Sequence, residues 1–164
     1  MTAMHASEGI RFVHHVGISV AGLDLSLAFW EALLGKTARW RGVLEAPYLA
    51  RITGYPGVRI QAALVELPGG VLLELLQYVQ PTDTPNDSAT ARPGNVHVCL
   101  RVDDLDEQWR RAVELGARPV SQAPVDITTG PNAGARAAYL RDPDGVTIEL
   151  FQVPAAQMTQ APVC

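Results

Sequence analysis

PGGVLLELLQ at residues 68–77 and PDGVTIELFQ at residues 143–152 are two versions of one ten-residue pattern. Pro, Gly, Val, Glu, Leu and Gln occupy the same places in both versions, so Glu74 and Glu149 are equivalent positions. In each version a turn containing proline and glycine precedes a mostly apolar run, which predicts the second strand of a hairpin. An internal repeat of this kind indicates two copies of one structural module.

A second pair of segments supports the duplication. HVGISVAGLD at 15–24 and HVCLRVDDLD at 97–106 share His, Val, Val, Leu and Asp, which makes His15 and His97 equivalent. Each segment continues into a helical pattern that is expected to close on a glycine, Gly35 or Gly116. The two pairs occur in the same order in both halves of the chain, so we interpret them as a duplication.

The local patterns predict the order β-α-β-β-β in each half. In the first half we expect a helix capped by Asp24 or Ser26, an irregular loop rich in proline and glycine, and four strands; the helix covers about 25–34, the loop 45–57, and the strands 13–20, 37–44, 58–67 and 71–79. In the second half we expect a helix over about 104–115 and strands at 96–102, 118–121, 135–141 and 146–152.

One α+β domain is the predicted organisation, because a single module of this size is too small to be stable alone. Module 1 covers about 12–80 and module 2 about 95–153. A polar, proline-containing linker at about 81–94 joins them, and residues 154–164 are expected to form a flexible tail.

Composition excludes several classes of function. The net charge is −4, and the Lys and Arg residues are scattered, so we expect no nucleic-acid partner. We find no export signal, and the apolar run around Glu74 is too short to span a membrane. Two cysteines in 164 residues favour a reducing compartment. The expectation is a cytoplasmic protein that acts on a small molecule.

The matched histidines and glutamates point to a metal site. Side chains alternate along a strand, so His15 shares a face with Gly17 and Ser19, opposite the apolar residues that pack on the helices. A buried, unpaired carboxylate is costly, so Glu74 in its leucine run must be neutral, paired or bound to a cation. For one glutamate alone, a solvent-facing position on an edge strand is the simpler explanation of the pattern. The match in both halves favours the cation.

We therefore predict one divalent ion held by His15, Glu74, His97 and Glu149. Two imidazoles and two carboxylates suit Zn, Ni, Co, Fe or Mn rather than Ca or Mg. Four protein ligands leave two positions of an octahedral ion open for two substrate oxygens. The ion would stabilise an enolate or enediolate while Glu149 or Glu74 acts as the catalytic base.

Four further residues are candidates for substrate binding. Arg101 shares the predicted face of His97 and can hold an anionic group, although pairing with a nearby aspartate explains it equally well. Arg59 and Gln61 share a strand face that is either solvated or in contact with substrate. Tyr78 falls on the face of Glu74 and is expected to line the cavity.

The chain resembles the vicinal oxygen chelate superfamily, which includes glyoxalase I, methylmalonyl-CoA epimerase, extradiol dioxygenases and bleomycin-resistance proteins. The segments that carry the resemblance are HHVGI at 14–18, LELL at 73–76, VHV at 96–98, RVDD at 101–104 and DPDGVTIEL at 142–150. The resemblance implies paired β-α-β-β-β modules in an open, mixed-sheet barrel around the metal, often within a homodimer. It assigns metal ligation to the same four residues and proton transfer to Glu149.

Three functions remain open at this point. The first is a metal-dependent isomerase or lyase, epimerase-like or glyoxalase-like, that abstracts a proton next to the carbonyl of a thioester, hemithioacetal or related substrate. The second is a resistance protein that sequesters a small toxic molecule. The third is an Fe(II)-dependent extradiol dioxygenase.

Overall fold

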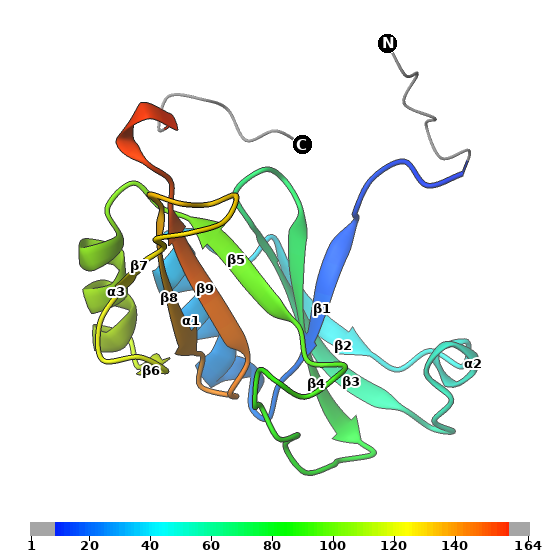
Figure 1. Ribbon diagram of the computed structural model, residues 1–164. Coiled ribbons are helices and arrows are strands. Elements are labelled where there is room, and N and C mark those ends of the chain that lie inside the picture. The colour runs from blue at the N-terminus through cyan, green and yellow to red at the C-terminus, as the bar shows by residue number, and fades with distance from the viewer. Residues whose placement is uncertain (1–8, 158–164) are drawn as a thin grey trace.

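Each half of the chain forms its own mixed β-sheet in the computed structural model, which describes residues 9–157 (Figure 1). The first half contains β1 (His15–Ser19), α1 (Leu23–Leu34), β2 (Trp40–Leu44), α2 (Leu49–Thr53), β3 (Arg59–Glu66) and β4 (Leu72–Gln80). The second half contains β5 (His97–Arg101), α3 (Leu105–Glu114), β6 (Arg118–Pro119), β7 (Val125–Asp126), β8 (Arg136–Arg141) and β9 (Thr147–Gln152). No helix within residues 9–157 is long and apolar enough to cross a membrane.

The two sheets repeat one topology. Their strand orders are β1-β4-β3-β2 and β5-β9-β8-β6, with β7 also paired to β8. The first strand of each half runs parallel to the last, and the other pairings are antiparallel. The predicted α+β class with mixed sheets is confirmed. As a consequence of this order, β1 and β5 are both edge strands.

The structure differs from the predicted elements in three places. The segment expected to be an irregular loop contains α2, which buries Leu49 and ends at Gly54 with a φ of 79°. The short strand β7 was not expected from the sequence. Of the tail predicted as flexible, Ala155–Gln157 form a 3-10 turn, and 158–164 lie outside the described residues.

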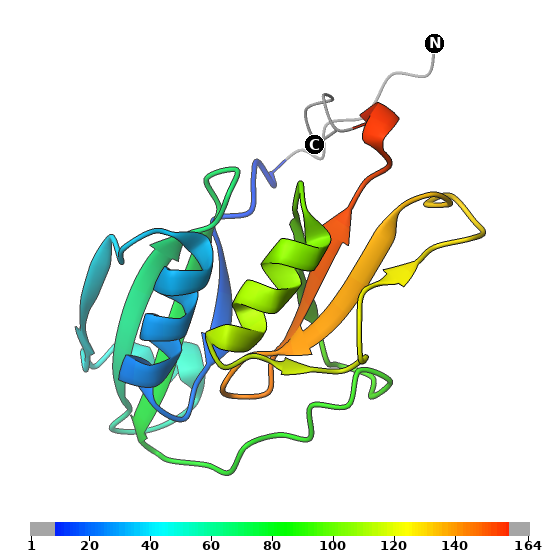
Figure 2. The ribbon, with the colours of Figure 1, turned by 90° about the vertical axis from the view of Figure 1, so that its left-hand side faces the viewer.

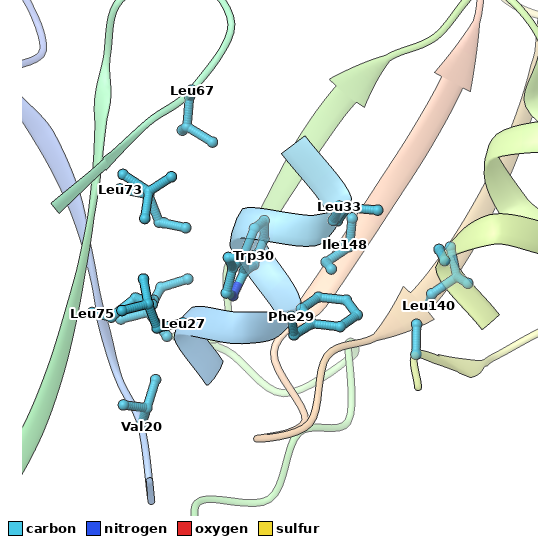
Figure 3. Packing of buried hydrophobic residues seen from close by; sticks show 14 of the residues in the cluster. Val20, Leu27, Phe29, Trp30, Leu33, Leu67, Leu73, Leu75, Leu140 and Ile148 are labelled. Atoms are coloured by element: carbon cyan, nitrogen blue, oxygen red, sulfur yellow. The ribbon is translucent and has the colours of Figure 1, made fainter. Parts of the chain in front are cut away.

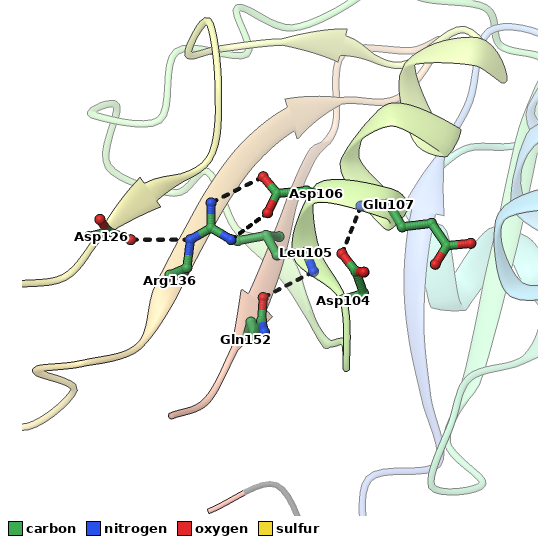
Figure 4. A network of polar contacts seen from close by, with 7 residues as sticks. All are labelled: Asp104, Leu105, Asp106, Glu107, Asp126, Arg136 and Gln152. Atoms are coloured by element: carbon green, nitrogen blue, oxygen red, sulfur yellow. Dashed lines mark hydrogen bonds and ion pairs between the residues drawn. The ribbon is translucent and has the colours of Figure 1, made fainter. Parts of the chain in front are cut away.

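The cap of α1 also differs from the prediction. The helix starts after Gly22, and neither Asp24 nor Ser26 caps it. Instead, the Leu23 backbone N–H donates to the Gln77 side chain over 2.9 Å. The Leu105 N–H at the start of α3 donates to Gln152 over 3.0 Å in the same way (Figure 4). These repeat-matched glutamines therefore tie each helix to the last strand of its own module.

The helix α1 lies between the two sheets (Figure 3). On one side it packs against Leu73 and Leu75 of β4, and on the other against Leu140 of β8 and Ile148 of β9. Trp30, which is fully buried, donates its indole N–H to Asp142 over 3.2 Å. Since one cluster of buried residues contains side chains from both modules, the modules share a single core.

Polar contacts fix the modules further. Figure 2 shows α1 and α3 side by side, and the Arg111 guanidinium of α3 donates to the Ala32 carbonyl of α1. Asp144, in the turn between β8 and β9, accepts from the Ala21 N–H over 2.7 Å and from the Ser26 hydroxyl. The turn of module 2 is thereby anchored to the start of α1 in module 1.

A separate network holds α3 within module 2 (Figure 4). Asp104 caps the helix by accepting the Glu107 N–H. Arg136 of β8 binds Asp106 through two hydrogen bonds and Asp126 of β7 through one. Hydrogen bonding from Arg136 lowers the pKa of Asp106. Arg136 thus links α3, β7 and β8.

Replacing Trp30 by alanine is expected to destabilise the protein strongly, because the indole fills the space between the sheets and satisfies Asp142. We expect a loss of about 3–5 kcal/mol in the free energy of unfolding, measured by urea denaturation. The control is Trp40→Ala, at a side chain that is 41% exposed, which should cost less than about 1 kcal/mol. Equal losses for the two variants would contradict this description of the core.

Candidate functional site

One face of each edge strand is open and carries the predicted histidine. In β1, His15, Gly17 and Ser19 are exposed, whereas Ile18 is buried against the helices. In β5, His97, Cys99 and Arg101 are exposed in the same alternation. The predicted separation into a packed face and an open face is present in both modules.

Each histidine lies beside the glutamate of its own module. His15 Nε2 is 3.4 Å from Glu74 Oε2, and His97 Nε2 is 3.0 Å from Glu149 Oε2. The register is the same in both modules, because Glu74 lies opposite Gly17 and Glu149 lies opposite Cys99. Both imidazoles are 43% exposed, whereas the carboxylates are only 22% and 16% exposed. The structure therefore contains two equivalent His–Glu pairs.

Within one chain the two pairs do not meet. In the described part of the chain, no group of three or more His, Cys, Asp or Glu side chains is placed to hold a metal ion. Figure 1 shows β1 and β5 separating toward one end, and neither pairs with the other. The four residues of a single chain therefore do not fit one four-ligand ion, in contrast to the sequence-based expectation. Each pair by itself supplies one imidazole and one carboxylate, which is half of the donors of a four-ligand site.

Two residues that the sequence did not assign to the site, His14 and Tyr139, support these pairs. His14 Nδ1 lies 2.8 Å from His15 Nδ1, so the His14 ring helps to direct the other nitrogen of His15 toward Glu74. Tyr139 of β8 lies opposite Glu149, and its ring centroid is 5.4 Å from that of His97. Burial, with a contribution from Glu149, raises the pKa of Tyr139. Side chains alternate along β8, and this alternation could have placed Tyr139 on the same face as Glu149. The equivalent residue in module 1 is Leu64, so the comparison of the two modules did not identify Tyr139.

The candidate substrate-binding residues occupy different places. Arg59 pairs with Glu45 over 3.1 Å, and Arg101 donates to the Gln157 carbonyl over 3.0 Å. Gln61 is half-buried on β3. Tyr78 lines a cavity beside β1 and makes an edge contact with Tyr55.

Cys99 lies on the open face of β5 between His97 and Arg101. Burial, the charge of Glu149 and a hydrogen bond to that carboxylate together raise the pKa of the Cys99 thiol to about 12. The thiol is therefore protonated at neutral pH, although the residue as a whole is exposed.

Comparison with known proteins assigns the fold to a family. Residues 14–139 match the model of the Glyoxalase/Bleomycin resistance protein/Dioxygenase superfamily. A protein named 2-epi-5-epi-valiolone epimerase from Actinomyces sp. is 30% identical over 154 residues, covering 90% of this chain and 82% of its own length. An uncharacterized Bacillus subtilis protein, YwbC, is 31% identical over 143 residues, covering 85% of this chain and 96% of its own.

Two solved structures show the same fold. A glyoxalase family protein from Bacillus cereus superposes with a TM-score of 0.73 at 26% identity, over 93% of this chain and 100% of that one. Glyoxalase I from Leishmania major superposes with a TM-score of 0.58 at 20% identity, over 91% and 90% of the two chains. At 20% identity, the similarity to the Leishmania major protein shows a common fold alone.

The environment of Cys99 predicts a slow reaction with alkylating reagents. In a Cys164→Ser background with chelator at pH 8, iodoacetamide should modify Cys99 at least about a hundredfold more slowly than a small thiol of ordinary pKa, because little thiolate forms. Glu149→Gln removes the neighbouring charge and should raise the rate, whereas Glu45→Gln should not. Mass spectrometry measures the modification, and equal rates in the two variants would contradict the contact.

Proposed function

The chain belongs to the glyoxalase/bleomycin resistance protein/dioxygenase superfamily, and from this premise we propose that it is a metal-dependent isomerase that moves a proton on the carbon next to a carbonyl group. The observation that carries the proposal is the pair of equivalent His–Glu contacts on β1–β4 and β5–β9. A structural role alone does not require two mostly buried carboxylates in apolar strands, each in contact with a half-exposed imidazole.

We propose that two copies of the chain complete the metal site. In a two-fold dimer, the His15–Glu74 half of one copy would face the His97–Glu149 half of the other, which gives two complete sites. Closure within one chain is disfavoured because α1 and the Trp30–Asp142 contact hold the two sheets in fixed positions.

The surroundings of the two edge strands support a partner there. An exposed edge strand offers unpaired N–H and C=O groups to another chain. Phe12 and Val13, which lead into β1, and Val96, which precedes β5, are large apolar residues exposed next to the histidines. A second copy of the chain would cover these residues while it supplies the missing donors.

The proposed roles follow from the donor set. A divalent ion held by His15, Glu74, His97 and Glu149 would supply a Lewis acid for a substrate oxygen. Glu149 takes the proton from the carbon, and the electrons of the C–H bond move to the carbonyl oxygen to give an enolate. Return of a proton to the other face of the carbon inverts its configuration, and Glu74 is the carboxylate available for that step. The epimerase relative, at 30% identity, supports this isomerase chemistry over ring cleavage or sequestration.

If Glu149 transfers the proton, replacing its carboxylate should greatly slow the exchange of the substrate α-proton. Glu149→Gln should slow the exchange of the substrate α-proton for deuterium by about 10²–10⁴-fold. Proton NMR in D₂O with Ni, Co, Zn or Mn supplied measures the exchange. The probes are a 2-methylacyl-CoA thioester, the hemithioacetal of methylglyoxal and glutathione, and a cyclic polyhydroxy ketone (an inosose).

The matched control is Glu114→Gln, which alters an exposed carboxylate at the end of α3. It should exchange the proton at the rate of the unmodified protein. Absence of exchange with all three probes and all four metals, or equal rates for the two variants, would contradict the proposed function.

A further inference from the structure

A cavity of about 770 Å³ is lined by Gly17 of β1, the strand partner of Glu74. Its walls are the second half of β1, Tyr55 and Tyr78 of module 1, the linker between the modules, and the segment from Arg141 to Thr147. This volume lies in the range of about 300–1,000 Å³ that is common for small-molecule sites.

Gly17, which lines the cavity, lies next to the Glu74 carboxylate. A side-chain carbon on Gly17 would stand 3.9 Å from Glu74 Oε2 and 3.7 Å from Leu76 Cδ1, so the missing side chain leaves space beside this carboxylate. On the other wall Thr147, the strand neighbour of His97, lines the same space. A molecule in the cavity would therefore lie against the strand neighbours of Glu74 and His97.

The charged groups of the cavity do not suit an anionic ligand. Among the lining residues that the structure describes, the only cationic side chain is Arg141. Its guanidinium donates to the carbonyls of Ser88 and Gly145 and to the Thr147 hydroxyl, so it holds the linker and the hairpin in place. Asp83 and Asp144 add negative charge. Phosphate and carboxylate groups, as in coenzyme A or glutathione, would meet no available cationic side chain among these lining residues.

The neutral groups suit a hydroxylated ring. Ser19, Tyr55, Tyr78 and Thr82 bring hydroxyl groups to the walls, and each can both donate and accept. The rings of Tyr55 and Tyr78 meet edge to face with centroids 6.1 Å apart, which offers an aromatic surface to the C–H groups of a ring. We propose that the cavity binds the body of an uncharged, polyhydroxylated cyclic carbonyl compound. This inference rests on the proposed function, because it names the substrate class of the same site.

Calorimetric titration of the full-length protein, with and without chelator, tests the assignment. The probes are an inosose, which is neutral, inositol monophosphate, which has a similar ring but is anionic, and coenzyme A. We expect the inosose to bind at least about tenfold more tightly than either anion, with an affinity that changes less than about twofold between low and high salt. Tyr55→Ala should weaken its binding by about tenfold, and Tyr55→Phe should weaken it less.

The matched control is Tyr48→Ala, at an exposed tyrosine next to α2 that does not line the cavity, and it should leave the affinity unchanged. Tighter binding of either anion, no binding of the inosose, or equal effects of Tyr55→Ala and Tyr48→Ala would overturn the inference. If the inosose fails to bind while Glu149→Gln still abolishes exchange with another probe, the assignment of the cavity is wrong and the proposed function stands. If the inosose binds and no probe exchanges its proton, the proposed function falls and the assignment stands.

Discussion

The burial of α1 between the two sheets determines where the other parts of the described chain lie. Trp30 fills the space between β4 and the β8–β9 hairpin and satisfies the buried Asp142 carboxylate. Asp142 in turn accepts the N–H groups of Asp144 and Val146, which shape the turn that anchors module 2 to module 1. Large relative motion of the sheets would therefore break packing and hydrogen bonds together. The two sheets consequently hold their His–Glu pairs apart.

This constraint connects the fold to the proposed chemistry. Gene duplication gives a chain two equivalent pairs, His15–Glu74 and His97–Glu149, each on the open face beside a free edge. One pair supplies two ligands, which is too few for a tightly held catalytic ion. Two chains joined through β1 and β5 would supply four ligands at each of two sites. The cavity beside Gly17 would then present a substrate to a site to which both copies contribute.

Much of the fold could be predicted from the sequence, because the repeat fixed the order of the elements and the alternation in β1 and β5 fixed their faces. The helix α2 escaped prediction because glycine and proline around it hide a single helical turn that is held by the burial of Leu49. The cap of α1 escaped because Gln77 is distant in sequence from Leu23 and meets it only after the sheet has formed. The equivalence of the two histidines, and of the two glutamates, follows from the repeat. The repeat does not determine whether the two pairs meet, because the packing of α1 against both sheets sets the distance between them.

The most direct test of the central claim is the metal content of a mixed dimer made from His15→Ala and His97→Ala chains that carry different tags. If each site combines halves from two copies, the mixed dimer has one site with all four ligands and one without either histidine. Elemental analysis should then find about one tightly bound ion per mixed dimer, held at least about tenfold more tightly than by either variant alone. A mixed dimer that binds metal no better than the separate variants would contradict a site shared between copies.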